Sequence, residues 1–305
     1  MAHTDRPLHN FPSLHKDVIN DIQVNKLGTR LATCSSDGYV FVQDITVNPP
    51  QHLASLAGHA ASVRRISWSM SGYLATVGES GFLIIFQEQP DSPAVYEPIF
   101  KFSHDSIVND VCFFNSPSLS DPCIVATATE DGYLHVFKQA GEDFSHSKYY
   151  AHSAACTCLS FHDELPLIAT GGQDNKINIW MEDDDSWKNI FPPLCKHTST
   201  VTDVSFAPSH SIPGIRLMAS CSEDGSVFVW SGSDSQFDGS PVVTMPSPVT
   251  RVSWSQSGVS LFITSDGISV WSRFNGEWTC NSELDGIQVK TPAPILQPPP
   301  QRSMY

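Results

Sequence analysis

Histidine, serine or threonine, and aspartate recur in a fixed order along the chain, and these residue types form the catalytic triads of hydrolases. One set is His152, Thr170 and Asp174, and the next is His197, Ser220 and Asp224. An active site is normally built once, whereas this set returns in successive segments. The repetition favours a structural role in each segment, and we predict that the chain is not an enzyme.

Other candidate chemistry is equally open to structural explanations. The acidic run 182–185 has ligands suited to a divalent cation, but it lies between one strand ending at Trp180 and another starting at Trp187, which favours a solvated hairpin turn. No phosphate-binding glycine motif or nucleophile elbow occurs. The eight cysteines include no C-x-x-C spacing, as expected of reduced thiols in a cytoplasmic protein. We therefore predict no cofactor and no metal.

Three arginines form a candidate anion patch: Arg64, Arg65 and Arg251. If they share one rim of the fold, their guanidinium groups suit bidentate binding of the phosphate or carboxylate groups of a peptide or phosphopeptide. The alternative is pairing with acidic loops, because 32 acidic residues against 17 basic ones give a net charge of −15. This balance also argues against nucleic-acid binding and against attraction to anionic membranes. The sequence leaves both roles of the arginines open.

The elements that position these residues follow from an internal repeat. His15, His59, His104, His152 and His197 recur at spacings of 44, 45, 48 and 45 residues, a period typical of one four-stranded propeller blade. Six residues after each histidine a strand begins, and a sixth copy continues without its histidine. The six entry positions are Asp21, Arg65, Asp110, Cys158, Asp203 and Arg251. The repeat predicts an all-β, six-bladed propeller.

Each copy contains a hairpin turn such as Ser36-Asp37-Gly38 or Glu223-Asp224-Gly225, because aspartate and glycine suit the backbone of tight turns. Four residues before the turn aspartate or its equivalent stands a hydroxyl residue in five copies and Phe262 in the sixth. A fourth strand follows each turn region, and the last one is predicted around Trp278 to Cys280.

The pattern resembles the WD-repeat β-propeller, in which a histidine, a strand hydroxyl, a turn aspartate and a tryptophan form a hydrogen-bonded tetrad. The resemblance implies two complete tetrads: His152, Thr170, Asp174 and Trp180, and His197, Ser220, Asp224 and Trp230. Common closed propellers use the N-terminal segment as the outer strand of the last blade. Here the last copy has its own fourth strand, and Pro7 and Pro12 interrupt the N-terminal segment. We predict an open ring without such a closing strand.

The domain organisation follows from these limits. Residues 1–14 are predicted to be a flexible head, residues 15–284 the six-bladed propeller and residues 285–305 a Pro-rich disordered tail. The longest aliphatic and aromatic run, residues 82–86, is far shorter than the ~18 residues that a membrane-spanning helix needs. Any association with a membrane is therefore expected to be indirect.

Particular wordings resemble one family of WD-repeat propellers, the Sec-thirteen family. They are His15-Lys-Asp-Val-Ile-Asn-Asp21 in the first copy, Asp174-Asn-Lys-Ile-Asn-Ile-Trp180 in the fourth, Thr202-Asp-Val-Ser-Phe-Ala-Pro208 in the fifth, and Arg251-Val-Ser-Trp-Ser255 with Gly276-Glu-Trp278 in the sixth. The resemblance spans roughly residues 15 to 282. It departs at Gln43, which replaces an aromatic residue, and in the Pro-rich tail.

The resemblance implies a non-catalytic scaffold: an open propeller that accepts a blade in trans from an α-solenoid subunit. Its expected settings are the outer cage of the endoplasmic-reticulum export coat, COPII, and the scaffold of the nuclear pore. The residues expected to border the partner-blade gap are Ile22, Val24, Val252, Trp254 and Trp278. The alternatives are a Seh-one-like propeller of the pore and of nutrient signalling, and a substrate-receptor propeller that binds peptides through the arginine patch.

Overall fold

The computed structural model describes residues 13–115, 123–141, 143–184, 186–211, 215–233, 236–274 and 277–284. The predicted head up to residue 12, the predicted tail 285–305 and any closing strand within them lie outside the described residues. Within the described part, no helix is long and apolar enough to span a membrane.

The first three blades cover the N-terminal half of the chain. Blade one contains β1 (Ile19–Val24), β2 (Arg30–Ser35), β3 (Val40–Asp44) and β4 (Gln51–Leu56). Blade two contains β5 (Val63–Trp68), β6 (Leu74–Gly78), β7 (Phe82–Gln89) and β8 (Ser92–Ser103). Blade three contains β9 (Val108–Phe114), β10 (Ile124–Thr129), β11 (Tyr133–Ala140) and β12 (Asp143–Tyr150).

The last three blades repeat this plan. Blade four contains β13 (Cys156–Phe161), β14 (Leu167–Gly172), β15 (Ile177–Asp183) and β16 (Ser186–Asn189). Blade five contains β17 (Val201–Phe206), the short 3₁₀ helix η1 (Ser209–Ser211), β18 (Arg216–Ser222), β19 (Ser226–Gly232) and β20 (Phe237–Thr244). Blade six contains β21 (Arg251–Trp254), β22 (Ser260–Thr264), β23 (Ile268–Phe274) and β24 (Glu277–Leu284).

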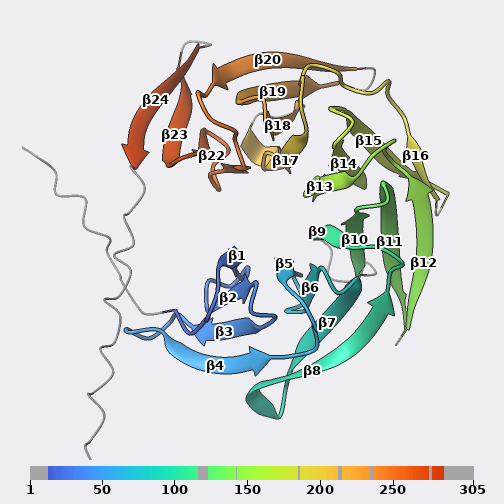
Figure 1. Cartoon of the computed structure of the whole chain (residues 1–305), viewed down its shortest axis with the longest axis vertical. Coiled ribbons are helices and arrows are strands. Elements are labelled where there is room, and N and C mark those ends of the chain that lie inside the picture. The colour runs from blue at the N-terminus through green and yellow to red at the C-terminus, as the bar shows by residue number, and fades with distance from the viewer. Residues whose placement is uncertain are drawn as a thin grey trace, which may run out of the picture.

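Each blade is a four-stranded antiparallel sheet whose strands pair in chain order. Figure 1 shows the blades around a central channel, with the first strand of each blade innermost and the fourth outermost. The fold is therefore a six-bladed WD-repeat propeller, as the repeat predicted. Blade six and blade one are the two ends of this arrangement, and we call the boundary between them the seam.

Turn chemistry keeps the blades in register. Gly132 has φ +85°, a backbone conformation that favours glycine, and a Cβ there would collide with the carbonyl oxygens of His152 and Ala154. Asn175 occupies the corresponding turn of blade four with φ +66°, which asparagine tolerates better than most residues. These tight turns bring the start of the next blade against the hairpin of the preceding one.

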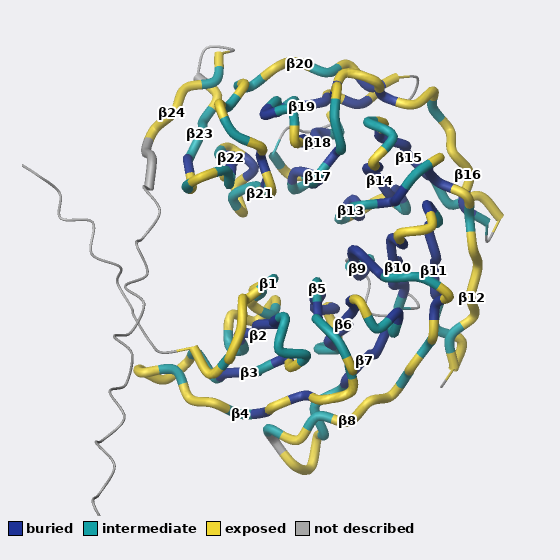
Figure 2. Tube along the Cα trace, viewed as in Figure 1, coloured by how far each residue is buried: buried dark blue, intermediate teal, exposed yellow. Residues whose placement is uncertain are grey.

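The apolar core is divided into layers between neighbouring blades. Five clusters of buried side chains fill the junctions from blades one and two through blades five and six. In the described part of the chain, no sixth cluster joins blade six to blade one. Figure 2 shows the same difference: β1 carries exposed positions, whereas the first strands β5, β9, β13 and β17 are mostly buried or intermediate.

One register prediction was wrong. Val252 in β21 pairs with Ile263, just as Leu159 pairs with Thr170, so Ile263 occupies the hydroxyl position of blade six and Phe262 does not. The last cross-strand pair of the β22–β23 hairpin, Thr264 with Ile268, encloses three residues, whereas the last pair of the β2–β3 hairpin, Cys34 with Val40, encloses five. Counting back four residues from the turn aspartate therefore gives the wrong position, and a slip of one residue moves a side chain to the opposite face.

Candidate interaction site

The first predicted tetrad forms one hydrogen-bonded chain in blade four. Nδ1 of His152 lies 2.9 Å from Oδ1 of Asp174, and Nε2 lies 3.0 Å from Oγ1 of Thr170. Nε1–H of Trp180 donates to the same hydroxyl oxygen over 3.1 Å. Burial raises the pKa of Asp174, but hydrogen bonds, with His152 first among their donors, outweigh it and bring the pKa to about 2. These hydrogen bonds connect β14, β15 and the turn between them to the loop that precedes β13.

The second tetrad contains an additional residue that the sequence did not reveal. Nε2 of His197 lies 2.7 Å from Oγ of Ser220, which also accepts Nε1–H of Trp230 over 2.8 Å. Nδ1 of His197, however, lies 2.8 Å from Oγ of Ser226 and 3.8 Å from Asp224. Ser226 in turn donates to Asp224, so the serine connects the two predicted members. Burial lowers the pKa of His197 to about 4, and the ring is neutral in the fold.

The carboxylates that converge on the central channel are occupied by backbone groups. Asp21 accepts N–H groups of Ile22 and of Ile66 in the next blade. The equivalent residues of blades three and five, Asp110 and Asp203, do the same toward blades four and six. Burial raises the pKa of Asp110 to about 6. These side chains connect neighbouring first strands, and their acceptor oxygens are used in doing so.

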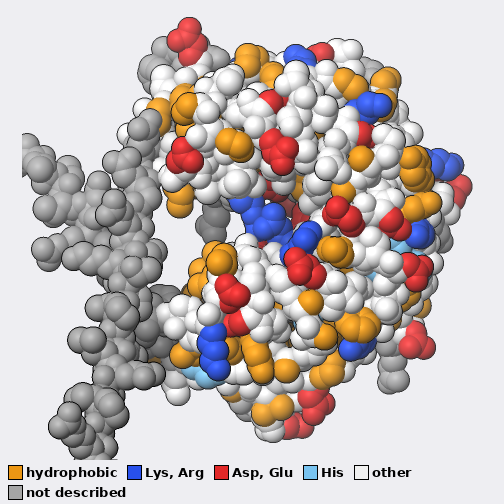
Figure 3. Space-filling view, viewed as in Figure 1, with side chains coloured by type: hydrophobic (Ala, Val, Ile, Leu, Met, Phe, Trp, Pro, Cys, Tyr) orange, Lys and Arg blue, Asp and Glu red, His pale blue; other side chains and the backbone are white. Residues whose placement is uncertain are grey.

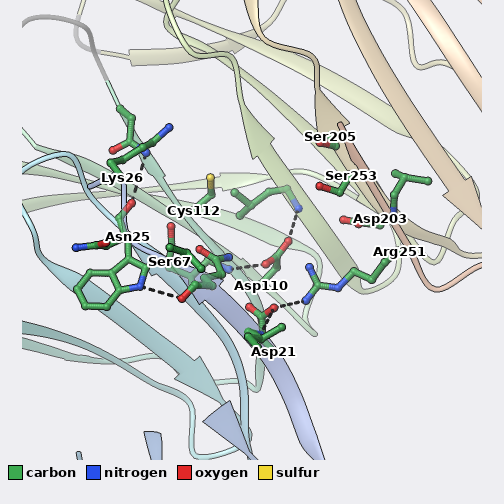
Figure 4. A pocket seen from close by; sticks show the side chains of 18 of the residues that line it. Asp21, Asn25, Lys26, Ser67, Asp110, Cys112, Asp203, Ser205, Arg251 and Ser253 are labelled. Atoms are coloured by element: carbon green, nitrogen blue, oxygen red, sulfur yellow. Dashed lines mark hydrogen bonds and ion pairs between the residues drawn. The ribbon is translucent and has the colours of Figure 1, made fainter. Parts of the chain in front are cut away.

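The three arginines do not form one anion patch. Arg64 pairs with Glu79 at 3.1 Å, and Nε of Arg65 lies 3.6 Å from Asp110. Arg251 pairs with Asp21 at 2.7 Å, as Figure 4 shows. The first two line a cavity of about 460 Å³, whereas Arg251 lines a different cavity of about 1010 Å³. The structure thus corresponds to the alternative of pairing with acidic side chains.

Blade one presents apolar side chains to the seam. Ile22 is 59% exposed and Val24 is 50% exposed, whereas their equivalents in blade two, Ile66 and Trp68, are 0% and 4% exposed. The difference arises because Ile66 and Trp68 pack on blade one, while the matching face of blade one has no described blade against it. The larger cavity, of about 1010 Å³, is lined by β1 and by first-strand residues of the other five blades, so it lies at the central channel.

The residues assigned to the gap on blade six lie on its other face. Val252 is buried in the cluster with blade five, and Trp254 and Trp278 pack against that cluster. Nε1–H of Trp254 also donates to the carbonyl of Ser205 in blade five over 3.0 Å. The prediction that these three residues border the gap was wrong, because alternation defines two faces but does not say which neighbour each face meets.

The seam face of blade six instead contains Phe262, Ile268 and Val270, which cross-strand pairing aligns on one side of the sheet. Phe262 is 39% exposed and takes the position of an alanine in every other blade. Those alanines, all fully buried against the next blade, are Ala32, Ala75, Ala126, Ala169 and Ala219. The sequence alone contains this signal: the same position is alanine in five blades and phenylalanine in the sixth. Figure 3 shows hydrophobic side chains on both borders of the opening and charged ones around the channel.

The seam is crossed at its inner end by the Arg251–Asp21 ion pair described above. Because Asp21 also holds Ile66 of blade two, this carboxylate links three blades at the channel. The ion pair thus lies at the channel end of the seam, and the exposed apolar side chains Ile22, Val24 and Phe262 lie on its two borders.

Comparison with known proteins shows where this arrangement belongs. The model "WD domain, G-beta repeat" matches residues 6–44, 144–181 and 191–231. A protein of Arabidopsis thaliana, "Protein transport protein SEC13 homolog A", is 31% identical over 295 residues, which cover 89% of this chain and 97% of the relative. The chain belongs to the SEC13 family.

Other SEC13 proteins agree over similar lengths. The human "Protein SEC13 homolog" is 30% identical over 316 residues, covering 95% of this chain and 97% of the relative, and the Drosophila melanogaster homologue is 27% identical over 320 residues, covering 95% and 88%. SEC13 proteins are structural WD-repeat proteins and not enzymes. The predicted resemblance and the prediction of a non-catalytic chain are confirmed.

Proposed function

We propose that this chain is a scaffold that accepts a β-blade in trans from an α-solenoid subunit, and that it builds the COPII outer cage for transport from the endoplasmic reticulum to the Golgi. Relatives bearing the name "protein transport protein" support the transport setting. The same scaffold would serve the nuclear pore if the chain also binds a pore α-solenoid. Its localisation would accordingly be cytoplasmic, peripheral at export sites and on COPII vesicles.

The observation that carries the proposal is the difference between the seam and the other boundaries. Five junctions are filled by buried clusters, whereas Ile22, Val24 and Phe262 remain exposed on the two borders of the seam. Exposed apolar faces of this kind mark interaction sites, and a β-blade is the shape that the other five boundaries accept. A partner blade would bury both borders at once.

Co-expression tests the proposal. The chain is produced alone and together with the α-solenoid subunit of the COPII outer cage from the same genome. We expect a stoichiometric complex on size-exclusion chromatography and a thermal unfolding midpoint several degrees above that of the isolated chain, because a ligand that binds only the folded state stabilises it. The proposal would be overturned if the chain is monomeric and stable on its own, and if the subunit neither forms a complex with it nor raises its unfolding midpoint.

Location is tested separately. A fluorescently tagged chain is expected at endoplasmic-reticulum exit sites, and a signal at the nuclear rim would add the pore. If the tagged chain is absent from exit sites and present at the nuclear rim, the proposed setting in the COPII coat is wrong and the nuclear pore takes its place.

A further inference from the structure

Blade four shows how one blade holds the first strand of the next. The hydroxyl of Thr157 donates both to the carbonyl of Gly171 in its own blade and to the carbonyl of Val201, at the start of β17 in blade five. Three residues later, Oγ of Ser160 accepts the N–H of Phe206, at the end of β17. Two hydroxyls thus hold the two ends of a neighbouring strand through its backbone.

The contacts recur at other junctions. Thr202 donates to the carbonyl of Val249 in blade six, as Thr157 does to blade five. Ser67 accepts the N–H of Phe113 in blade three, as Ser160 does from Phe206. Because the partner groups are all backbone groups, the contacts depend on the presence of a strand and not on its side chains.

Blade six carries the same pair at the same spacing. Thr250 and Ser253 occupy the positions of Thr157 and Ser160 relative to the strand entry residue, and both are exposed. Thr250 keeps the bond within its own blade, to the carbonyl of Thr264 at 3.2 Å. Among the described residues, nothing bonds to the side chain of Ser253, which lies on the wall of the larger cavity (Figure 4).

Phe262 limits the size of the side chains that can pack against blade six. At the five filled junctions a buried alanine faces the next blade, and large side chains of that blade, such as Ile66 and Trp68, pack against it. A phenylalanine in this position fills the space that those large side chains would use, because facing core positions must combine large with small. Ile22 and Val24 of blade one therefore cannot pack against blade six in the way that Ile66 and Trp68 of blade two pack against blade one.

We infer that Thr250, Ser253 and Phe262 form the partner-binding contact of blade six: the two hydroxyls hold the backbone of an incoming β-strand, and Phe262 packs on a glycine, alanine or serine of that strand. The inference rests on the proposed function and specifies its partner as a strand with a small residue facing blade six. Thr250 donates to a carbonyl at the start of the strand. Ser253 accepts an N–H about five residues further on, as Ser160 does in β17.

Affinity measurements test the contact, with the COPII α-solenoid subunit of the same genome as the probe. The double variant Thr250→Val with Ser253→Ala is expected to bind at least tenfold more weakly than the native chain, and Phe262→Ala likewise. Tyr150→Ala, an exposed aromatic residue on blade three, is the matched control and should bind within twofold of the native chain. Since the substituted seam residues are exposed, unfolding midpoints within 2 °C of native would show that the fold is intact. Native binding by the double variant would overturn the inference while leaving the proposed function in place.

A second readout does not depend on the identity of the partner. The variant Phe262→p-benzoylphenylalanine is expressed in the cells that normally make the chain, irradiated, and its cross-linked peptides are identified, with Tyr150→p-benzoylphenylalanine as the control. We expect a cross-link to a β-strand of another protein, at or beside glycine, alanine or serine, and not from the control position. A cross-link to Ile22 or Val24 of the same chain, to a helix, or to nothing would overturn the inference. If the COPII subunit does not bind the native chain but this cross-link forms, only the proposed coat setting fails.

Discussion

The junction between blades one and two and the seam between blades six and one are built from equivalent positions but have different environments. Ile66 and Trp68 are buried against Ala32 and Cys34, while Ile22 and Val24 are exposed on one border of the seam and Phe262 is exposed on the other. At the filled junction the side chain of Asn20 in blade one donates to the carbonyl of Val63 in blade two, and large side chains pack against small ones. At the seam the same positions carry apolar and hydroxyl groups without a described neighbour, apart from one ion pair at the channel.

The comparison teaches that a repeat can be regular in its strands and irregular at one boundary. Burial of an apolar side chain contributes about 1.5–3 kcal/mol, so five filled junctions stabilise the chain while the seam leaves that contribution available to a partner. If a partner blade binds as proposed, the seam would supply most of the binding free energy, and it should respond to mutation differently from the junctions.

The largest expected difference is between Ile66→Ala and Ile22→Ala. Ile66 is buried, so its truncation should lower the free energy of unfolding of the isolated chain by about 2–5 kcal/mol. Ile22 is mostly exposed, and its truncation should change that free energy by less than ~0.5 kcal/mol. Urea titration followed by tryptophan fluorescence measures both. Equal losses for the two variants would mean that the seam is filled in solution.

The second-largest expected effect is a loss of stability at low pH. Burial lowers the pKa of His59, His104 and His197 to about 4, below the usual 6.5. The unfolded chain therefore binds more protons than the folded chain between pH 6.5 and about 4, and stability falls as the pH falls through that window. Below it, carboxylates with a lowered folded pKa, such as Asp174 at about 2, continue the loss. Burial raises the pKa of Asp110 to about 6 and also raises the pKa of Asp203, so these two carboxyl groups oppose the trend. A fourth histidine, His135, adds to the trend, because burial lowers its pKa to about 3.

Thermal unfolding at pH 7.0 and 4.5 measures this effect. We expect a lower midpoint at pH 4.5, with hydrogen exchange increasing first in blades that contain these histidines and least in blade six, where Met245 replaces the histidine. A midpoint that rises on acidification would show that the histidines do not dominate.

A smaller difference is expected between two tetrad hydroxyls. Oγ1 of Thr170 bonds to both His152 and Trp180, whereas Oγ1 of Thr33, on the seam face of blade one, bonds to His15 and has Gln43 in place of the tryptophan. Thr170→Val should cost about 1–3 kcal/mol because it leaves buried polar groups without a partner, and Thr33→Val should cost less. Calorimetry of the two variants gives the order, and a larger loss from Thr33→Val would contradict it.

The sequence was sufficient for the repeat and its strands because histidine spacing, turn aspartates and period-two alternation all agree in register. It was insufficient for the seam face of blade six. Val252, Trp254 and Trp278 are apolar and alternate correctly, but only the packing against blade five shows which face they take. The hairpin of blade six is shorter, so counting four residues back from the turn aspartate gave Phe262 the position that Ile263 occupies. Composition does not show that turn residues are missing.

Other misses have the same physical origin. Ser226 enters the blade-five tetrad because its hydroxyl fits between His197 and Asp224, a matter of side-chain position that spacing does not express. The pairing of Arg65 and Arg251 with Asp110 and Asp21 depends on which entry residues meet across the channel. Sequence periodicity predicts the elements, whereas contacts between blades depend on how the blades are arranged around the channel.

Hydroxyl-radical footprinting of the chain, alone and bound to the COPII α-solenoid subunit, tests the central claim most directly, because it measures the solvent exposure of individual side chains. In the isolated chain we expect strong labelling of Phe262 and measurable labelling of Ile22, with Trp68 protected. In the complex, labelling of Phe262 and Ile22 should fall toward that of Trp68, while Tyr150 stays unchanged. Protection of Phe262 and Ile22 in the isolated chain, or unchanged labelling of both in the complex, would contradict a seam that is completed by a partner.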